Sequence, residues 1–73
     1  MTLLDRFMSG MIACRCKSQQ QKDFVVEMAD KMGYRTYPPY DVNIIYFYNE
    51  GLLGMYVDTR LPYDFEEIFK EEY

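Results

Sequence analysis

The clearest pattern in the chain lies between residues 18 and 32, where apolar positions recur with helical spacing. Ser18 and Gln21 match the S-x-x-Q capping box at the start of this segment, and Gly33 is a typical left-handed residue after its end. The charged residues lie largely off the apolar stripe, which consists of Phe24, Val25, Met28, Ala29 and Met32. The pattern predicts the main helix of the protein over residues 18–32.

Two shorter segments near the chain ends have the same spacing. Residues 2–8 hold an apolar stripe, with Thr2 as the expected cap and Gly10 as the stop, although a strand is the competing interpretation. Asp64 and Glu67 form a second pattern of the capping-box type, in a segment whose apolar residues are Phe65, Ile68 and Phe69. We therefore expect short helices at the N- and C-termini.

A β-hairpin is predicted in the second half of the chain. Residues 43–48 are rich in Ile, Tyr and Phe, which favour strands, and residues 49–51 have the composition of a turn. Residues 52–58 are the expected partner strand, which Gly54 weakens or bulges.

Two further segments are predicted to be extended. Residues 11–16 alternate, so that one face of the strand collects Ile12, Cys14 and Cys16. Residues 34–40 contain two prolines, which cannot donate ladder hydrogen bonds, so this segment is an edge strand or a polyproline-like loop. Residues 59–62 are expected to be a connector.

Together the elements predict an α+β fold, in which one main helix packs on a small, mostly antiparallel sheet of about three or four strands. The chain has 73 residues, which is room for a single domain over residues 1–73. Its hydrophobic content of 49% and aromatic content of 18% exclude intrinsic disorder.

A domain of this size has a small core and needs a further source of stability. The chain has two cysteines and no histidine, which disfavours a structural metal and leaves self-association into a homo-oligomer as the expected source. No run of about 20 apolar residues indicates a membrane span. Asp5 and Arg6 interrupt the stretch that a signal peptide would need, so we expect a cytoplasmic protein with reduced thiols.

The composition argues against an enzyme. There is no histidine to act as a base, and Ser9 and Ser18 are the only serines. A site built from carboxylates alone would need a pair such as Asp41 and Asp58, which no spacing singles out. No motif calls for a cofactor.

Cys14 and Cys16 form a C-x-C pattern, which in other contexts binds metal or undergoes redox chemistry. A zinc site needs two further ligands, and the chain has neither a histidine nor a third cysteine. The i, i+2 spacing on a strand is poor for a disulfide. We therefore expect buried thiols in the sheet and no metal site.

Tyrosines gather on the predicted hairpin. Ile44, Tyr46 and Tyr48 share one face, and Tyr56 lies on the opposite strand. Such a face is half-buried under loops or at a dimer interface, or it binds a protein partner. An RNA-stacking platform is disfavoured, because the hairpin carries Glu50 and Asp58 in place of cations.

The net charge is −4, and the charge is unevenly distributed. Residues 1–35 carry six basic and four acidic side chains, whereas residues 36–73 carry two basic and eight acidic ones. The acidic set near the C-terminus is either a solvated helix face or a carboxylate array that imitates phosphates, and it consists of Asp64, Glu66, Glu67, Glu71 and Glu72. The expected aromatic anchors beside this set are Tyr46, Tyr48 and Tyr63.

The segment MIACRCKS at residues 11–18, followed by QQQKDF and closed by KMGYR at residues 31–35, resembles small phage-encoded proteins. Those proteins share a strand of this kind, a helix of about four turns, a Gly-Tyr ending and a Tyr-rich hairpin. The resemblance covers residues 10–58. It implies a phage or prophage accessory protein with a strand–helix–hairpin core, and members with a known role tend to inhibit host machinery.

These observations lead to the hypothesis of a small acidic inhibitor that blocks a host nucleic-acid-processing or defence protein, as anti-CRISPR proteins do. Its partner is expected to present a basic surface; neither direct nucleic-acid binding nor a membrane is favoured. One alternative is an oligomeric sponge for a signalling nucleotide, with phosphates held by Arg15, Lys17, Arg35 and Arg60. The other is a nucleic-acid-binding regulator.

Overall fold

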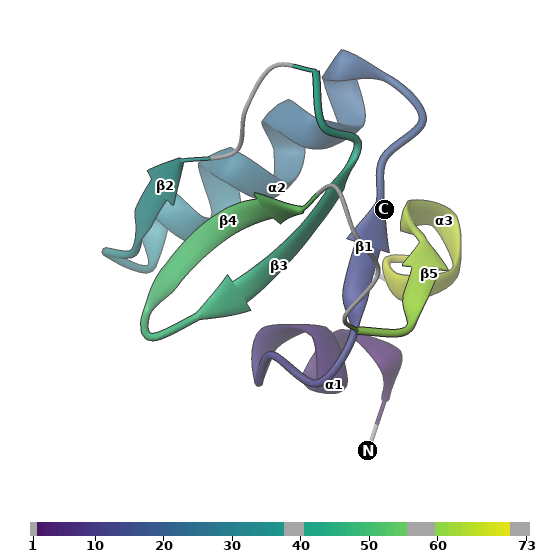
Figure 1. The fold of residues 1–73 in the computed structure, drawn as a ribbon, viewed down its shortest axis with the longest axis horizontal. Coiled ribbons are helices and arrows are strands. Elements are labelled where there is room, and N and C mark those ends of the chain that lie inside the picture. The colour runs from purple at the N-terminus through teal and green to yellow at the C-terminus, as the bar shows by residue number, and fades with distance from the viewer. Residues whose placement is uncertain (1, 38–40, 56–59, 71–73) are drawn as a thin grey trace.

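The computed structural model describes residues 2–37, 41–55 and 60–70. The fold is α+β, as predicted: a sheet carries all three helices on one face (Figure 1). The elements follow one another as α1 (Leu3–Met8), β1 (Ala13–Arg15), α2 (Gln19–Lys31), β2 (Arg35–Tyr37), β3 (Ile44–Tyr48), β4 (Gly51–Met55), β5 (Pro62–Asp64) and α3 (Phe65–Ile68).

The sheet is larger and less antiparallel than predicted. It has five strands in the order β2-β4-β3-β1-β5. β3 runs antiparallel to both β1 and β4, whereas the pairs β1–β5 and β2–β4 are parallel. β5 begins at Pro62, where a connector was expected. A strand of three residues is too short to show alternation, so its partner in the fold decides its conformation.

The hairpin between β3 and β4 turns within two residues. Tyr48 pairs with Gly51, and the residues between them, Asn49 and Glu50, have φ angles of 48° and 58°. Two consecutive left-handed residues form the type I′ turn whose twist matches that of the flanking strands. The described part of β4 ends at Met55, so the last three residues of the predicted strand 52–58 lie outside the described residues.

The core lies between the helices and the inner face of the sheet. Alternation along β3 turns Ile45 and Phe47 inward, and their register partners Cys14 and Leu52 are buried on the same side. All five phenylalanines take part in ring contacts here, and the closest centroids are those of Phe65 and Phe69 at 4.7 Å. The rings join α1, α2, α3 and β3 into one cluster.

The helix caps explain where the helices begin. Thr2 accepts a hydrogen bond from the Asp5 amide at 3.1 Å, and the Asp5 carboxylate accepts from the Thr2 amide. Ser18 accepts from the Gln21 amide as predicted, but the Gln21 side chain reaches the Lys17 amide, at 2.7 Å, instead of closing the box. The predicted box at α3 is absent, because the Asp64 side chain makes no capping bond.

Gly10 connects α1 to β1 at a point of close approach. Its φ angle is 81°, and a Cβ atom there would lie 2.8 Å from the carbonyl oxygen of Phe47. Gly33, after α2, has the same φ angle, but a Cβ atom would meet nothing within 4 Å. A side chain at Gly33 would therefore cost only the free energy of a strained left-handed backbone. A side chain at Gly10 would cost the same strain and, in addition, a steric clash with β3.

We predict that Gly10→Ala lowers the free energy of unfolding by about 3 kcal/mol or more, because strain and a clash with the Phe47 carbonyl add together. Gly33→Ala, which adds only strain, should cost roughly 1 kcal/mol. Urea unfolding followed by circular dichroism measures both. Equal losses in the two variants would contradict the close approach of Gly10 to β3.

Candidate functional site

The face of the sheet opposite the helices carries the candidate site, and the strand register assigns its residues. Register partners point to the same side, so three rows cross this outer face. The first row is Tyr37, Leu53 and Tyr46, and the second is Arg35, Gly51 and Tyr48. The third joins Ile44 to Arg15 and Asp64. We call these residues the outer face.

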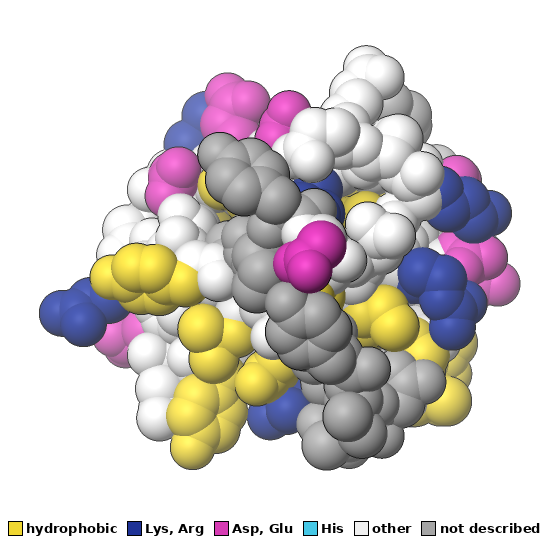
Figure 2. All heavy atoms as spheres, turned by 45° about the horizontal axis from the view of Figure 1, so that its top comes forward, with side chains coloured by type: hydrophobic (Ala, Val, Ile, Leu, Met, Phe, Trp, Pro, Cys, Tyr) yellow, Lys and Arg dark blue, Asp and Glu magenta, His cyan; other side chains and the backbone are white. Residues whose placement is uncertain are grey.

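Aromatic rings of the outer face are open to solvent. Tyr37 is 65% exposed and Tyr48 is 53% exposed, while Tyr46 and Leu53 are half-buried. Figure 2 shows a group of hydrophobic side chains at the molecular surface, with Lys and Arg side chains near it. In the second row Gly51 lies between Arg35 and Tyr48 and has no side chain, so no side chain separates these two residues.

Arg60 reaches this face from outside the strands. Its guanidinium carbon lies 4.2 Å from the centre of the Tyr46 ring and 5.9 Å from that of Tyr48. Its Nε atom donates to the carbonyl oxygen of Gly10 at 2.9 Å. The cation–π contact and this hydrogen bond together hold the guanidinium in place. A hollow of about 260 Å³ lies next to it, lined in part by Tyr48, Asn49 and Glu50.

The structure divides the tyrosines that the sequence grouped as anchors. Tyr46 and Tyr48 share the outer face with Ile44, as predicted. Tyr63 is the register partner of Cys14, so it belongs to the inner face and packs against the core. Tyr56 lies outside the described residues. Tyr37 joins the face instead, through the pairing of β2 with β4.

Sequence analysis named the cations of this face only for the nucleotide alternative and did not assign them to one face of the sheet. Arg15, Arg35 and Arg60 come from β1, β2 and the segment before β5, and non-local strand pairing brings the first two onto one side. Alternation within residues 35–37 places Arg35 and Tyr37 on the same side, which was a usable signal. Nothing in the local pattern points to the stacking of Arg60 on Tyr46.

The acidic set is also divided. Asp64 accepts from Arg15 at 3.0 Å and lies 3.6 Å from the ammonium of Lys17. The Glu66 carboxylate lies 3.7 Å from the same ammonium and accepts a hydrogen bond from the side-chain amide of Gln21 at 2.9 Å. Two of the five carboxylates are therefore neutralised within the chain. Glu71 and Glu72 lie outside the described residues.

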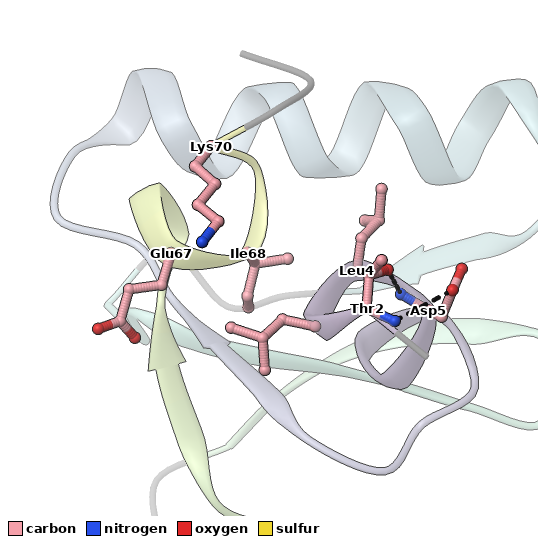
Figure 3. A pocket seen from close by; sticks show the side chains of 7 residues that line it. Thr2, Leu4, Asp5, Glu67, Ile68 and Lys70 are labelled. Atoms are coloured by element: carbon pink, nitrogen blue, oxygen red, sulfur yellow. Dashed lines mark hydrogen bonds between the residues drawn. The ribbon is translucent and has the colours of Figure 1, made fainter.

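Glu67 lines a groove of about 440 Å³ between α1 and α3. Its floor includes Ile68, and Lys70 extends toward it (Figure 3). The Glu67 carboxylate points away from Ile68, and the carboxylate of Asp5 on the other wall is engaged in the helix cap. The groove is apolar at its floor and has no concentrated negative charge.

Cys14 and Cys16 project together onto the inner face, with their sulfur atoms 3.9 Å apart. Both are free thiols and buried, and Lys22 at the start of α2 is also buried, at 3% exposure. The hydrogen bond with Cys16, together with burial, raises the pKa of Cys14 far above its usual value. The hydrogen bond from Cys14 lowers the pKa of Cys16, and the Lys22 charge lowers it further.

Within residues 2–37, 41–55 and 60–70, no group of three or more potential metal-ligating side chains is found. Across the same residues, none of the helices has the length and apolar character needed to cross a membrane. Comparisons of the chain with protein-family models, with curated proteins and with solved structures find no match. The site itself therefore carries the functional argument.

We predict that the stability of the Glu66→Gln variant decreases less than that of the wild type as the pH is lowered. The hydrogen bond from Gln21 and the charge of Lys17 hold the pKa of Glu66 below its usual value in the folded protein. A lowered pKa stabilises the fold above the unfolded-state pKa of about 4.3, and this contribution is lost as the pH falls through that value and then through the lower pKa of the folded state. Urea midpoints at several pH values should thus fall less steeply in the variant.

Glu67→Gln is the matched control, because it removes the same charge one residue away. The structure shows no hydrogen bond or ion pair between the Glu67 carboxylate and another described residue. Its urea midpoints should follow the wild-type slope. Identical slopes for wild type and Glu66→Gln would contradict the stabilising role of the Gln21–Glu66–Lys17 contacts.

Proposed function

We propose that the protein is a non-enzymatic inhibitor that docks on a host protein through the outer face of its sheet. The proposal is carried by one observation: Tyr37 and Tyr48 are exposed on the same face as Tyr46 and the arginines. Tyrosine and arginine are, with tryptophan, the residues that supply most binding energy in protein interfaces.

The face is suited to binding because its parts are held in place before a partner arrives. The tyrosines stand on paired strands, and a Tyr side chain loses little conformational entropy when it is buried. Arg60 is already held by the Tyr46 ring and the Gly10 carbonyl. Contacts made by ordered groups cost less free energy than contacts made by groups that must first be ordered.

The negative net charge of the chain supports a partner protein that has a basic surface. The formal net charge of −4 repels nucleic acid and attracts basic protein surfaces over long range. Proteins that process or recognise nucleic acid have such surfaces. We propose a host nucleic-acid-processing or defence protein as the target, with long-range attraction from the acidic chain and close contacts from the outer face.

We predict that Tyr37→Ala combined with Tyr48→Ala weakens partner binding by about 700-fold, since each lost anchor of this kind costs about 2 kcal/mol and the two losses add. Both rings are exposed, so the variant should keep its fold. The wild-type chain, immobilised, is used to isolate the partner from bacterial lysate, and the purified partner's binding and activity are then measured with each variant.

The control is Gln20→Ala with Glu27→Ala, on the exposed side of α2. This variant should bind and inhibit the purified partner like the wild type. A partner that binds the two double variants equally well, or whose activity does not change on binding, would contradict the proposal.

A small signalling nucleotide is a second candidate ligand. The structure favours it more than the sequence did, because Arg15 and Arg35 lie on the same face as the tyrosines, and Arg60 stacks there. Aromatic rings stack on bases and arginines bind phosphates. Arg15, however, is already paired with Asp64 at 3.0 Å.

Thermal unfolding with added cyclic dinucleotides separates the two candidates. The inhibitor proposal expects no shift of the melting temperature beyond that caused by inorganic phosphate. A saturable rise that Tyr48→Ala and Arg35→Ala each abolish would instead assign the face to nucleotides.

A further inference from the structure

Arg60 lines the hollow that lies beside Tyr48 at the border of the outer face. The hollow has a volume of about 260 Å³. Arg60 is half-buried there, whereas Arg15 and Arg35, the other arginines of this side, are exposed. A partner that reaches Arg60 therefore meets its charge in a recess and not on an open surface.

Two contacts hold the Arg60 guanidinium in place and leave most of its hydrogen-bond donors unused. Its carbon atom lies 4.2 Å from the centre of the Tyr46 ring. Stacking of this kind engages the face of the guanidinium, whereas its N–H bonds lie in the plane of the group. The Nε atom donates to the carbonyl oxygen of Gly10 at 2.9 Å. The terminal nitrogens, Nη1 and Nη2, remain for another acceptor.

These terminal nitrogens are open to solvent. Among the residues that the structure describes, neither nitrogen has a hydrogen bond or an ion pair. The described residues also contain no buried side-chain nitrogen or oxygen atom without a partner, so solvent reaches both atoms. A guanidinium that is fixed in position and has free terminal donors is preorganised to bind an anion, because little further ordering is needed.

The charges around the hollow select the class of anion. Arg60 is the single cation among the described residues that line it, and Glu50 of the hairpin turn adds a carboxylate to the same lining. A phosphate monoester carries about two negative charges, so Glu50 would repel it more strongly than it repels a carboxylate. A carboxylate is also planar, and its oxygens match the N–H groups of a guanidinium as a bidentate pair.

We propose that Arg60 and the hollow beside it receive the carboxylate of one Asp or Glu side chain of the protein partner. This inference rests on the proposed function, because it names the group of the partner that the outer face recognises. Pockets that enclose a whole small molecule have volumes of about 300–1,000 Å³, so the smaller hollow suits a single side chain. The partner then combines a basic surface, which long-range attraction selects, with an acidic residue in the close contact.

The test is an NMR titration of the isotope-labelled full chain with N-acetyl-L-glutamic acid α-amide, which has the side chain of Glu and one negative charge. The Nε–H signal of Arg60, assigned by its loss in Arg60→Lys, should shift until the site is saturated. The α-amide of N-acetyl-L-glutamine has the same shape and no charge. It should bind at least about tenfold more weakly, because a charged acceptor strengthens the hydrogen bonds.

Three variants separate the proposed contact from general effects of charge. Arg60→Lys keeps the positive charge but loses the planar donors, so it should weaken binding of the charged probe about tenfold. Arg6→Lys makes the same replacement at an exposed residue outside the hollow and should bind like the wild type. Glu50→Gln removes the repelling carboxylate and should strengthen binding about threefold. A gain in affinity cannot come from a variant that fails to fold.

Equal affinity of the wild type and Arg60→Lys for the charged probe, or equal affinity of the wild type for the two probes, would overturn the inference. Partner affinity should also fall about tenfold in Arg60→Lys, and an unchanged value would overturn the assignment of the hollow to the partner. The proposed function is tested separately, because the Tyr37 and Tyr48 double variant leaves Arg60 in place. Failure of that variant to weaken partner binding, with Arg60→Lys still weakening it, would contradict the proposed function alone.

Discussion

The pairing of β1 with strands on both of its sides is the constraint on which the rest of the structure depends. β1 has only three residues, yet it is antiparallel to β3 and parallel to β5. This position turns Cys14 into the core and Arg15 toward Asp64 on the outer face. It also places the residues before β5 next to β1, so that Arg60 can reach the Tyr46 ring.

The division of aromatic residues between the two faces follows from their chemistry. The phenylalanines have no polar group, and all five pack together on the inner side, where the rings contact one another at tilted or edge-on angles. The tyrosines of β2 and β3 keep their hydroxyl groups on the side without helices. One face of the sheet therefore stabilises the domain, and the other is available for binding.

Ion pairs within the chain reduce the number of carboxylates that are available for contact with a partner. The carboxylates of Asp64 and Glu66 are among the acidic residues closest to the C-terminus, but Arg15 of the neighbouring strand β1 and Lys17 neutralise them. The overall charge still acts at long range, whereas close contact must use side chains that are not already paired. This is why the tyrosines, together with Arg35 and Arg60, and not the ion-paired Asp64 and Glu66, are expected to make the close contacts.

Local pattern was sufficient for the parts of the fold that are governed by near neighbours in sequence. The main helix, the caps at Thr2 and Ser18, and the grouping of Ile44, Tyr46 and Tyr48 on one face are confirmed. The predicted stripe of the main helix is confirmed only in part, because Met32 is exposed and Lys22 is buried. Each confirmed feature depends on contacts within about four residues or on the two-residue period of a strand.

Only the tertiary structure decided the parallel pairing of β5 with β1, the placement of Tyr63 on the inner face and the stacking of Arg60 on Tyr46. These contacts join residues far apart in the chain, and their free energy comes from burial and strand pairing that no local pattern encodes. Composition and periodicity determined which residues this protein could bury. The sheet order determined which of the remaining side chains meet on one surface.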